Sequence, residues 1–350
     1  SRVRFSGVTM RDYFAFQWHI TESCDQRCKH CYIFSDPNRP PLNDMTFSGM
    51  KSVVDNCIDM CEKANRLPYF YITGGDPILH PDFWKLLELL HSKNIEFGIL
   101  GNPFHLDDGV CERLKRLGCD RYQLSLDGLR ETHDEIRKPG SFDTTLEKIA
   151  CINKAGITSV IMATVSKRNI DEIPALIDLV VEHNVDVFAF ARYCPSGFEK
   201  SNHIEPEEYR EFLGICRERF EHYKNSKTTF NMKDHLWTLY LHERGLYSIP
   251  EGLDDNTIYD GCNCGNCHLT ILSNGDILAC RRFPSRVGNV NNDGLYDVFT
   301  GPAMDEYREF DKFEKCSKCE LKRFCRGCPA VAHGYTGNHY AADPQCWKRL

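Results

Sequence analysis

The alternation of apolar runs and amphipathic stretches between residues 14 and 192 most constrains the fold of this chain. Each apolar run has the length of a strand and is followed by a stretch in which apolar residues recur at helical spacing. Strands that alternate with helices of this length predict βαβ units, a parallel sheet and right-handed crossovers. We therefore expect an α/β fold: a partial (β/α)6, TIM-like barrel whose functional loops lie at the carboxyl ends of the strands.

The predicted elements divide the chain into three parts. Strands are predicted at Phe14–Thr21, Tyr69–Thr73, Ile95–Leu100, Arg121–Leu126, Ile157–Val165 and Val185–Ala191. Helices are predicted at Phe47–Ala64, Pro81–Ser92, Asp108–Leu117, Phe142–Ala155 and Ile170–His183. We expect the barrel over residues 1–205, a helical connector over 206–255 and a cysteine-rich domain of hairpin and loops over 256–350.

Three cysteines follow the first predicted strand directly. Cys24, Cys28 and Cys31 have the spacing C-x3-C-x2-C. Thiolates are soft ligands that select iron–sulfur or zinc sites. Three of them on one short loop suit three irons of a cubane [4Fe-4S] cluster, which leaves the fourth iron open to a ligand that is not protein. A zinc loop or a chance group of buried cysteines is the alternative.

This cysteine loop resembles the signature of the radical SAM superfamily, in which His30 fits the aromatic residue usual before the third cysteine. The resemblance implies that Cys24, Cys28 and Cys31 are catalytic cluster ligands. It also implies that the open iron binds S-adenosylmethionine (SAM), which one-electron reduction cleaves to a 5′-deoxyadenosyl radical. One departure is Asp25, where many relatives carry Asn.

Gly74-Gly75-Asp76 follows the second predicted strand. Glycines let the backbone approach a ligand, and a carboxylate accepts a hydrogen bond from an ammonium group. Alone, such a tripeptide is more often a turn. In this position it resembles the GGE-type motif that contacts the methionyl amine of SAM, with Asp in place of Glu.

Other segments at the carboxyl ends of predicted strands also resemble the superfamily. Asn102 stands where relatives have a turn near the adenosine, and the resemblance implies that Ser125 and Asp127 reach the ribose or the carboxylate. Arg192 follows the sixth predicted strand, where an arginine can pair with the SAM carboxylate.

The segment after the fourth predicted strand carries a further, weaker resemblance. His133 and Arg137 fit an H-x-x-x-R helix entry of the superfamily. A helix start with a polar face explains the two residues equally well, so neither is assigned a cofactor contact.

Nine of the 19 cysteines lie in the C-terminal part of the chain. They are Cys262, Cys264, Cys267, Cys280, Cys316, Cys319, Cys325, Cys328 and Cys346. An Asn-Gly pair between alternating apolar residues predicts a β-hairpin just before Cys280. Eight soft ligands on short loops suit two four-coordinate clusters or two zinc ions.

This second array resembles the SPASM extension of radical SAM enzymes, which implies two auxiliary [4Fe-4S] clusters and three clusters in all. By position, one auxiliary cluster would use Cys262, Cys267, Cys280 and Cys328. The other would use Cys316, Cys319, Cys325 and Cys346. Cys264 is a surplus thiol that can replace Cys267, so that assignment stays open. The remaining cysteines, Cys194 among them, lack the spacing of metal ligands, with the exception of Cys57 and Cys61. We interpret this pair as buried free thiols.

Within the radical SAM/SPASM group, the chain resembles thioether-forming maturases of ribosomal peptides. The resemblance implies a precursor peptide as substrate and an electron donor of the flavodoxin or ferredoxin type. Alternatives are an anaerobic sulfatase-maturing enzyme, a SPASM enzyme that forms a carbon–carbon bond or an epimer, and a non-catalytic electron carrier. Sulfatase maturases tend to place Asp after the hairpin cysteine, whereas Arg281 and Arg282 follow Cys280 here. These arginines either attract an acidic peptide or are simply exposed.

The composition restricts the partners and the compartment. A net charge of -7 without a basic stripe does not suggest a nucleic-acid-binding protein. Neither a membrane-length apolar run nor a signal peptide is recognisable, so we expect a cytoplasmic protein whose thiols serve metal clusters rather than disulfides. Thirteen residues precede Phe14, too few for a peptide-recognition domain. Either a separate leader-binding protein or the barrel and SPASM surfaces would then hold the peptide.

Overall fold

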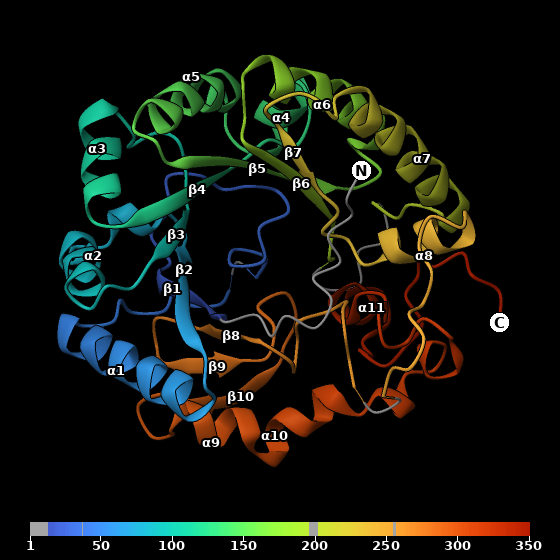
Figure 1. The fold of residues 1–350 in the computed structure, drawn as a ribbon. Helices are drawn as coiled ribbons and strands as arrows, with labels where there is room; N and C mark the ends of the chain where they lie inside the picture. Colours follow the sequence, from blue (N-terminus) through green and yellow to red (C-terminus); the bar gives the residue numbers. More distant parts are fainter. Residues whose placement is uncertain (1–12, 37, 196–201, 255–256) are drawn as a thin grey trace.

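One ten-stranded sheet runs through both halves of the molecule. The structure is a computed structural model that describes residues 13–36, 38–195, 202–254 and 257–350. The strand order is β10-β9-β8-β1-β2-β3-β4-β5-β6-β7. Figure 1 shows strands β1 to β7 curving into an open barrel with helices along its outer side. The predicted α/β partial barrel is confirmed.

The elements of the barrel follow the predicted alternation. Its strands are β1 (Tyr13–Thr21), β2 (Leu67–Gly74), β3 (Phe97–Leu100), β4 (Cys119–Ser125), β5 (Thr158–Val165), β6 (Val187–Arg192) and β7 (Thr229–Asn231). Each pairs in parallel with the next. Its helices are α1 (Phe47–Lys63), α2 (Phe83–Ser92), α3 (Asp108–Arg116), α4 (Arg130–Ile136), α5 (Ser141–Lys154), α6 (Ile173–Glu182), α7 (Pro206–His222) and α8 (Leu236–Glu243). Strand β7 lies in the predicted helical connector and is too short to show a period of two.

Strand β1 illustrates how the sequence builds two different faces of the sheet. Phe14, Phe16 and Trp18 are at most 2% exposed and belong to the hydrophobic core. Because side chains alternate along a strand, Gln17 and His19 point to the opposite, inner face of the barrel. The polar residues of β1 are therefore available to line the interior that the sheet encloses.

The C-terminal part extends the same sheet. The predicted hairpin is confirmed: β8 (His268–Ile271) pairs antiparallel with β9 (Asp276–Leu278). Strand β8 also pairs in parallel with β1, and β10 (Arg286–Asn289) completes the edge. Helices α9 (Leu295–Thr300), α10 (Pro302–Asp305) and α11 (Pro329–Thr336) follow. The cysteine-rich part thus begins directly beside the first strand of the barrel.

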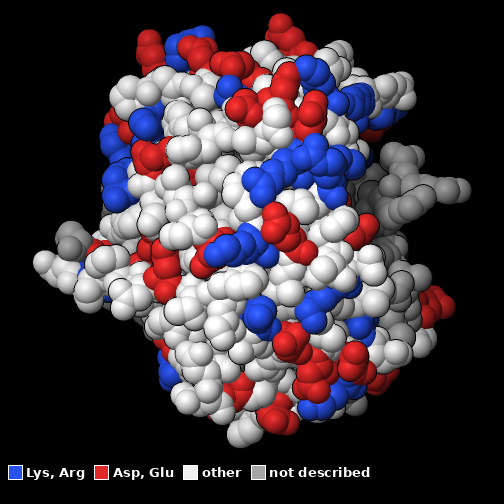
Figure 2. All heavy atoms as spheres, turned by 90° about the vertical axis from the view of Figure 1, so that its left-hand side faces the viewer, with Lys and Arg blue, Asp and Glu red and all other residues white. Residues whose placement is uncertain are grey.

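The surface supports no single-sign interaction patch on the face that carries α1 to α3. Basic and acidic side chains are interspersed there (Figure 2). Within the described residues, no helix is long and apolar enough to span a membrane.

Candidate active site

The cysteine loop lies at the carboxyl end of β1, as predicted. Its turn is held by a hydrogen bond from the Cys31 N–H to the Cys28 carbonyl at 3.0 Å and by the Gln26 N–H, which donates to Cys24 Sγ at 3.4 Å. Burial raises the pKa of Cys24 and raises that of Cys28 to about 11. Three thiols on one turn are the soft donor set that an iron–sulfur cluster deprotonates when it binds.

Gly74 and Gly75 allow the loop after β2 to lie directly against the cysteine loop. A Cβ atom on Gly74 would stand 2.1 Å from the Thr21 carbonyl oxygen, and one on Gly75 would stand 2.2 Å from that of Ser23. Gly74 also has a φ of +145°, which favours glycine. The Asp76 N–H donates to the Ser23 carbonyl at 2.7 Å. These glycines therefore fix the position of Asp76 relative to the cysteines.

Asp76 is a buried acid. Its side chain is fully buried, and among the residues that the structure describes, Oδ2 has no hydrogen-bond partner and the carboxylate pairs with no Lys or Arg. Burial raises the pKa of Asp76 to about 7, and the neighbouring Asp25 carboxylate adds to this shift. Ligand atoms of Asp25, Asp76 and His105 lie within 4.8 Å of one another. This arrangement fits a positively charged group such as the methionyl ammonium of SAM.

Asn102 connects this acidic group to the cysteine loop. Its side-chain Nδ2 donates to Asp25 Oδ1 at 2.8 Å and to Cys24 Sγ at 3.3 Å, and its backbone N–H donates to Asp76 Oδ1 at 3.3 Å. The structure thus brings Cys24, Asp76 and Asn102 together, three residues that the sequence predicted for one site. Ser125 ends β4 opposite Met162 of β5, and its contact with SAM stays a prediction.

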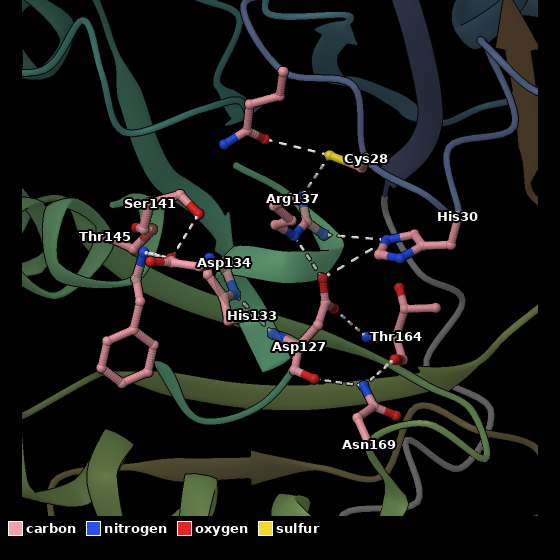
Figure 3. A network of polar contacts seen from close by, with 12 residues as sticks. Cys28, His30, Asp127, His133, Asp134, Arg137, Ser141, Thr145, Thr164 and Asn169 are labelled. Carbon is pink, nitrogen blue, oxygen red and sulfur yellow. Dashed lines mark hydrogen bonds and ion pairs between the residues drawn. The ribbon is translucent and has the colours of Figure 1, made fainter. Parts of the chain in front are cut away.

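Asp127 lies in a network that reaches the cysteine loop (Figure 3). Arg137 Nε donates to Asp127 Oδ2 at 2.5 Å, and Nη1 of the same guanidinium lies 3.6 Å from Cys28 Sγ. The Thr164 N–H donates to Asp127 Oδ1 at 2.8 Å. Burial alone would raise the pKa of Asp127, but Arg137 and His30 outweigh it and lower the pKa to about 2. The geometry supports a positioning role for Asp127, which orients Arg137 toward Cys28, and the predicted contact with SAM stays a prediction.

Arg192 is placed differently from the other predicted SAM-binding residues. Its guanidinium donates to Asp234 at 2.8 Å and to both oxygens of Asp343 at 2.6 and 2.8 Å, with a further bond to Gln345 at 2.8 Å. The Arg192 side chain is 1% exposed. Four of the five guanidinium N–H groups are therefore engaged within the protein. This engagement argues against the expected pairing with the SAM carboxylate and makes Arg192 a link between β6 and the C-terminal segment.

The first predicted auxiliary group gathers between the hairpin and the C-terminal loops. In addition to burial, Cys328 and Cys280 raise the pKa of Cys262, and Cys328 raises the pKa of Cys280, so the three thiols lie close together. Cys264 is buried beside the same three thiols. The Cys267 carbonyl accepts a hydrogen bond from the Ala15 N–H of β1 at 3.3 Å. This geometry favours Cys264 as a member of the group and leaves the Cys267 thiol as a prediction.

Cys194 joins this group, although its spacing gave no metal signal. A hydrogen bond from the Cys194 thiol lowers the pKa of Cys328, and Arg282 Nη2 donates to Cys328 Sγ at 2.9 Å. The position of Cys194 in the sequence could have indicated this, because Cys194 follows β6 at the carboxyl end of the strand. The group therefore combines thiols from the barrel and from the SPASM segment.

The second predicted auxiliary group is complete. Cys316, Cys319, Cys325 and Cys346 line one small hollow. Four thiols around one hollow are the donor set of a four-coordinate cluster.

The sequence matches two known domain families, and these matches agree with the geometry. Residues 18–180 match the radical SAM superfamily, and residues 262–329 match the SPASM iron-sulfur cluster-binding domain.

Curated relatives span nearly the whole chain. An AdoMet-dependent heme synthase of Methanosarcina barkeri is 26% identical over 341 residues, which are 94% of this chain and 95% of that protein. The mycofactocin maturase MftC of Mycolicibacterium smegmatis is 25% identical over 346 residues, 94% of this chain and 81% of that protein.

Solved structures share the fold. Streptococcus suis SuiB bound to S-adenosylmethionine superimposes with a TM-score of 0.75 at 23% identity, covering 96% of this chain and 77% of that chain. The structure of anSMEcpe with bound AdoMet gives 0.73 at 19% identity, covering 93% of each chain. Together, the two domain matches show that the chain carries a radical SAM domain followed by a SPASM domain, and it is an enzyme of the radical SAM superfamily.

Proposed function

We propose that this enzyme matures a ribosomal precursor peptide by joining a cysteine sulfur to a carbon of another residue. When bound, the cluster of the three-cysteine loop and SAM supply hydrogen abstraction, and an auxiliary cluster supplies an outlet for the second electron. In the peptide, one C–H and one S–H bond break and one C–S bond forms, so each link removes two hydrogens. The thiol proton passes to solvent. A donor of the flavodoxin or ferredoxin type provides the electron that SAM cleavage consumes.

A contact between the two cysteine-bearing segments carries this proposal. The Arg281 guanidinium lies 5.4 Å from the centre of the Tyr32 ring. Tyr32 directly follows Cys31, and Arg281 directly follows Cys280. A substrate held beside this contact is near the radical-generating loop and near the first auxiliary group. That arrangement supports an oxidative modification, in which the substrate loses an electron after losing hydrogen.

A peptide substrate is supported by similar proteins. SuiB bound to precursor peptide SuiA shares the fold, with a TM-score of 0.74 over 96% of this chain. The mycofactocin maturase relative is also named as a maturase. The sulfatase-maturing alternative has a fold neighbour in anSMEcpe, but Arg281 occupies the position after Cys280 where those enzymes tend to carry Asp.

A second candidate is modification of a tetrapyrrole. It is favoured by sequence, since three AdoMet-dependent heme synthases and an Fe-coproporphyrin III synthase are 24–26% identical over about 94% of this chain. Incubation with tetrapyrrole precursors and a search for the heme absorbance spectrum tests this candidate.

Mass spectrometry of a precursor peptide tests the first proposal. The peptide would be one encoded beside the gene and would be incubated without oxygen with the reconstituted enzyme, SAM and a reductant. We expect a loss of two hydrogens per link and cysteines that no longer react with iodoacetamide. The variant with Cys24, Cys28 and Cys31 all replaced by alanine serves as the control. Unchanged peptide mass with free thiols, alongside normal 5′-deoxyadenosine production, would contradict thioether formation.

A further inference from the structure

Cationic and imidazole side chains gather on the inner face of the barrel where β1 meets β8. In the parallel register, Ala15 pairs with His268 and Gln17 pairs with Thr270, so these four side chains share one face of the sheet. His19 lies on the same face, two residues beyond Gln17. Two cationic side chains, those of Lys233 and Arg281, approach from outside these strands. We call Lys233, Arg281, His19 and His268 the cation group.

The hydrogen bonds within this group involve neutral partners. With its amide oriented to satisfy hydrogen bonding, Gln17 accepts from Arg281 Nε at 3.2 Å. His19 Nε2 lies 3.3 Å from the Tyr32 hydroxyl, and His268 Nε2 lies 3.2 Å from Thr270 Oγ1. These bonds orient the side chains, but they give Arg281 no carboxylate partner among the described residues.

Lys233 adds a second positive charge to the same place. It follows β7 and keeps access to solvent. Partial desolvation of its ammonium group, followed by the charges of Arg281 and Arg282, lowers the pKa of Lys233 to about 7, so an anion is needed to keep it fully charged near pH 7. Among the described residues, neither Lys233 nor Arg281 forms an ion pair with a carboxylate. Cations grouped without an anion are unfavourable unless a ligand compensates them.

The two histidines complement these cations as hydrogen-bonding groups. Burial, followed by the charge of Arg281, lowers the pKa of His19 to about 3. This imidazole is therefore neutral near pH 7. A neutral imidazole can donate an N–H to an anion without adding charge to the group.

We propose that the cation group is a carboxylate-binding subsite, in which Arg281 and Lys233 pair with a carboxylate of the substrate. A guanidinium presents a fork of donors that matches a carboxylate, and Lys233 adds a second charge. This inference rests on the proposed function and narrows its substrate class. The substrate carries a carboxylate near the reacting carbon, held between the loop of Cys31 and the hairpin of Cys280.

An acidic peptide side chain and a propionate of a tetrapyrrole present the same chemistry, and two matched probe pairs distinguish them. The peptide pair is tetraglutamate and tetraglutamine, each amidated at the C-terminus and labelled at the N-terminus with the same uncharged fluorophore. The porphyrin pair is coproporphyrin III and its methyl ester. Binding to the reconstituted enzyme with SAM is measured without oxygen by fluorescence. We expect the acid of at least one pair to bind at least about tenfold more tightly than its uncharged partner, because hydrogen bonds between charged groups are the strong ones. The pair that shows the preference identifies the source.

Variants test which side chains cause the preference for the acid probe. Arg281→Gln combined with Lys233→Gln should abolish the preference for the acid, while Arg281→Lys should retain most of it. Arg286→Gln is the matched control, because Arg286 is 61% exposed and already pairs with Asp276. Unchanged iron and sulfide content shows that a variant keeps its clusters.

Several results would overturn the subsite. They are equal binding of acid and uncharged probe in both pairs, an undiminished preference in the double variant, or an equal loss in the Arg286 control. Failure of the proposed function gives a different result. Mass spectrometry would then show an unmodified precursor peptide, while the enzyme would still bind the acid more tightly than the uncharged probe. Conversely, normal peptide maturation without any acid preference would remove the subsite alone.

Discussion

Arg192 and Arg281 both lie where the barrel meets the C-terminal segment, but their charges are balanced in different ways. Arg192 is enclosed by the carboxylates of Asp234 and Asp343. Arg281 faces the Tyr32 ring and the Gln17 amide, which carry no charge. We conclude that the first arginine holds the two parts of the fold together, whereas the second is available to an anionic ligand.

The acids of the site show the same division. Asp127 is compensated by Arg137, which helps to hold its pKa at about 2. Asp76 pairs with no Lys or Arg in the described part of the chain, and burial raises its pKa to about 7. We infer that the compensated charge supports the structure and that the uncompensated acid awaits a ligand of opposite charge.

Replacement of Arg192 should have the largest effect on stability. Arg192→Met would leave Asp234 and Asp343 buried without their cation, and breaking a buried pair in this way costs about 3–5 kcal/mol. Urea unfolding under anaerobic conditions measures the loss. Arg286→Gln, at an exposed pair, should change the free energy of unfolding by no more than about 0.5 kcal/mol. Similar stabilities for the two variants would refute the structural role of Arg192.

Asp76 should make stability depend on pH when SAM is absent. Its pKa is higher in the folded state than in the unfolded state, so folding is favoured by the protonated form. That contribution is complete below about pH 4 and is lost as the pH rises to about 7. We expect the wild type to lose up to about 4 kcal/mol relative to Asp76→Asn over this range. If the free energies of unfolding of the two proteins changed by the same amount between pH 4 and 7, the raised pKa of Asp76 would be excluded.

Replacement of Arg281 should affect stability least among these charged groups. Arg281→Gln removes a cation that has no carboxylate partner, so we expect a change of no more than about 1 kcal/mol, of either sign. The same urea measurement applies. A loss comparable to that of Arg192→Met would show that Arg281 is structural and would remove the contrast between the two arginines.

Cys194 should tune the first auxiliary group without being required for its assembly. Cys194→Ala removes a hydrogen bond to Cys328, and such bonds to sulfur shift the potentials of iron–sulfur clusters. We expect full iron content with a shifted potential or electron paramagnetic resonance spectrum. Cys216→Ala, in the buried face of α7, should leave the spectrum unchanged. A loss of iron in Cys194→Ala would instead assign Cys194 as a ligand.

The local features of the fold could be predicted from the sequence. The strands of the barrel have a clear alternation with helices, and the Asn-Gly turn specifies the hairpin of β8 and β9. The C-x3-C-x2-C loop and Gly74-Gly75-Asp76 are short motifs whose residues are close in sequence. Their contacts with Asn102 follow from parallel strands that end at one edge.

Contacts between distant segments could not be predicted. The pairing of β8 with β1 joins residues that are about 250 positions apart, and no pattern in either strand specifies the other. Arg192 was expected to bind SAM because it follows the sixth predicted strand, and its partner Asp343 lies too far along the chain for the sequence to reveal their pairing. Likewise, the arginines after Cys280 suggested an acidic substrate. That Lys233 and His268 lie near Arg281 is visible only in the structure.

We infer that the loop of Cys24, Cys28 and Cys31 generates the radical, whereas the C-terminal cysteines hold separate clusters. The most direct measurement compares 5′-deoxyadenosine production and iron content in the wild type and in the variant with all three residues replaced by alanine. We predict that the variant makes no 5′-deoxyadenosine and keeps its auxiliary iron. Continued SAM cleavage by this variant would contradict the account.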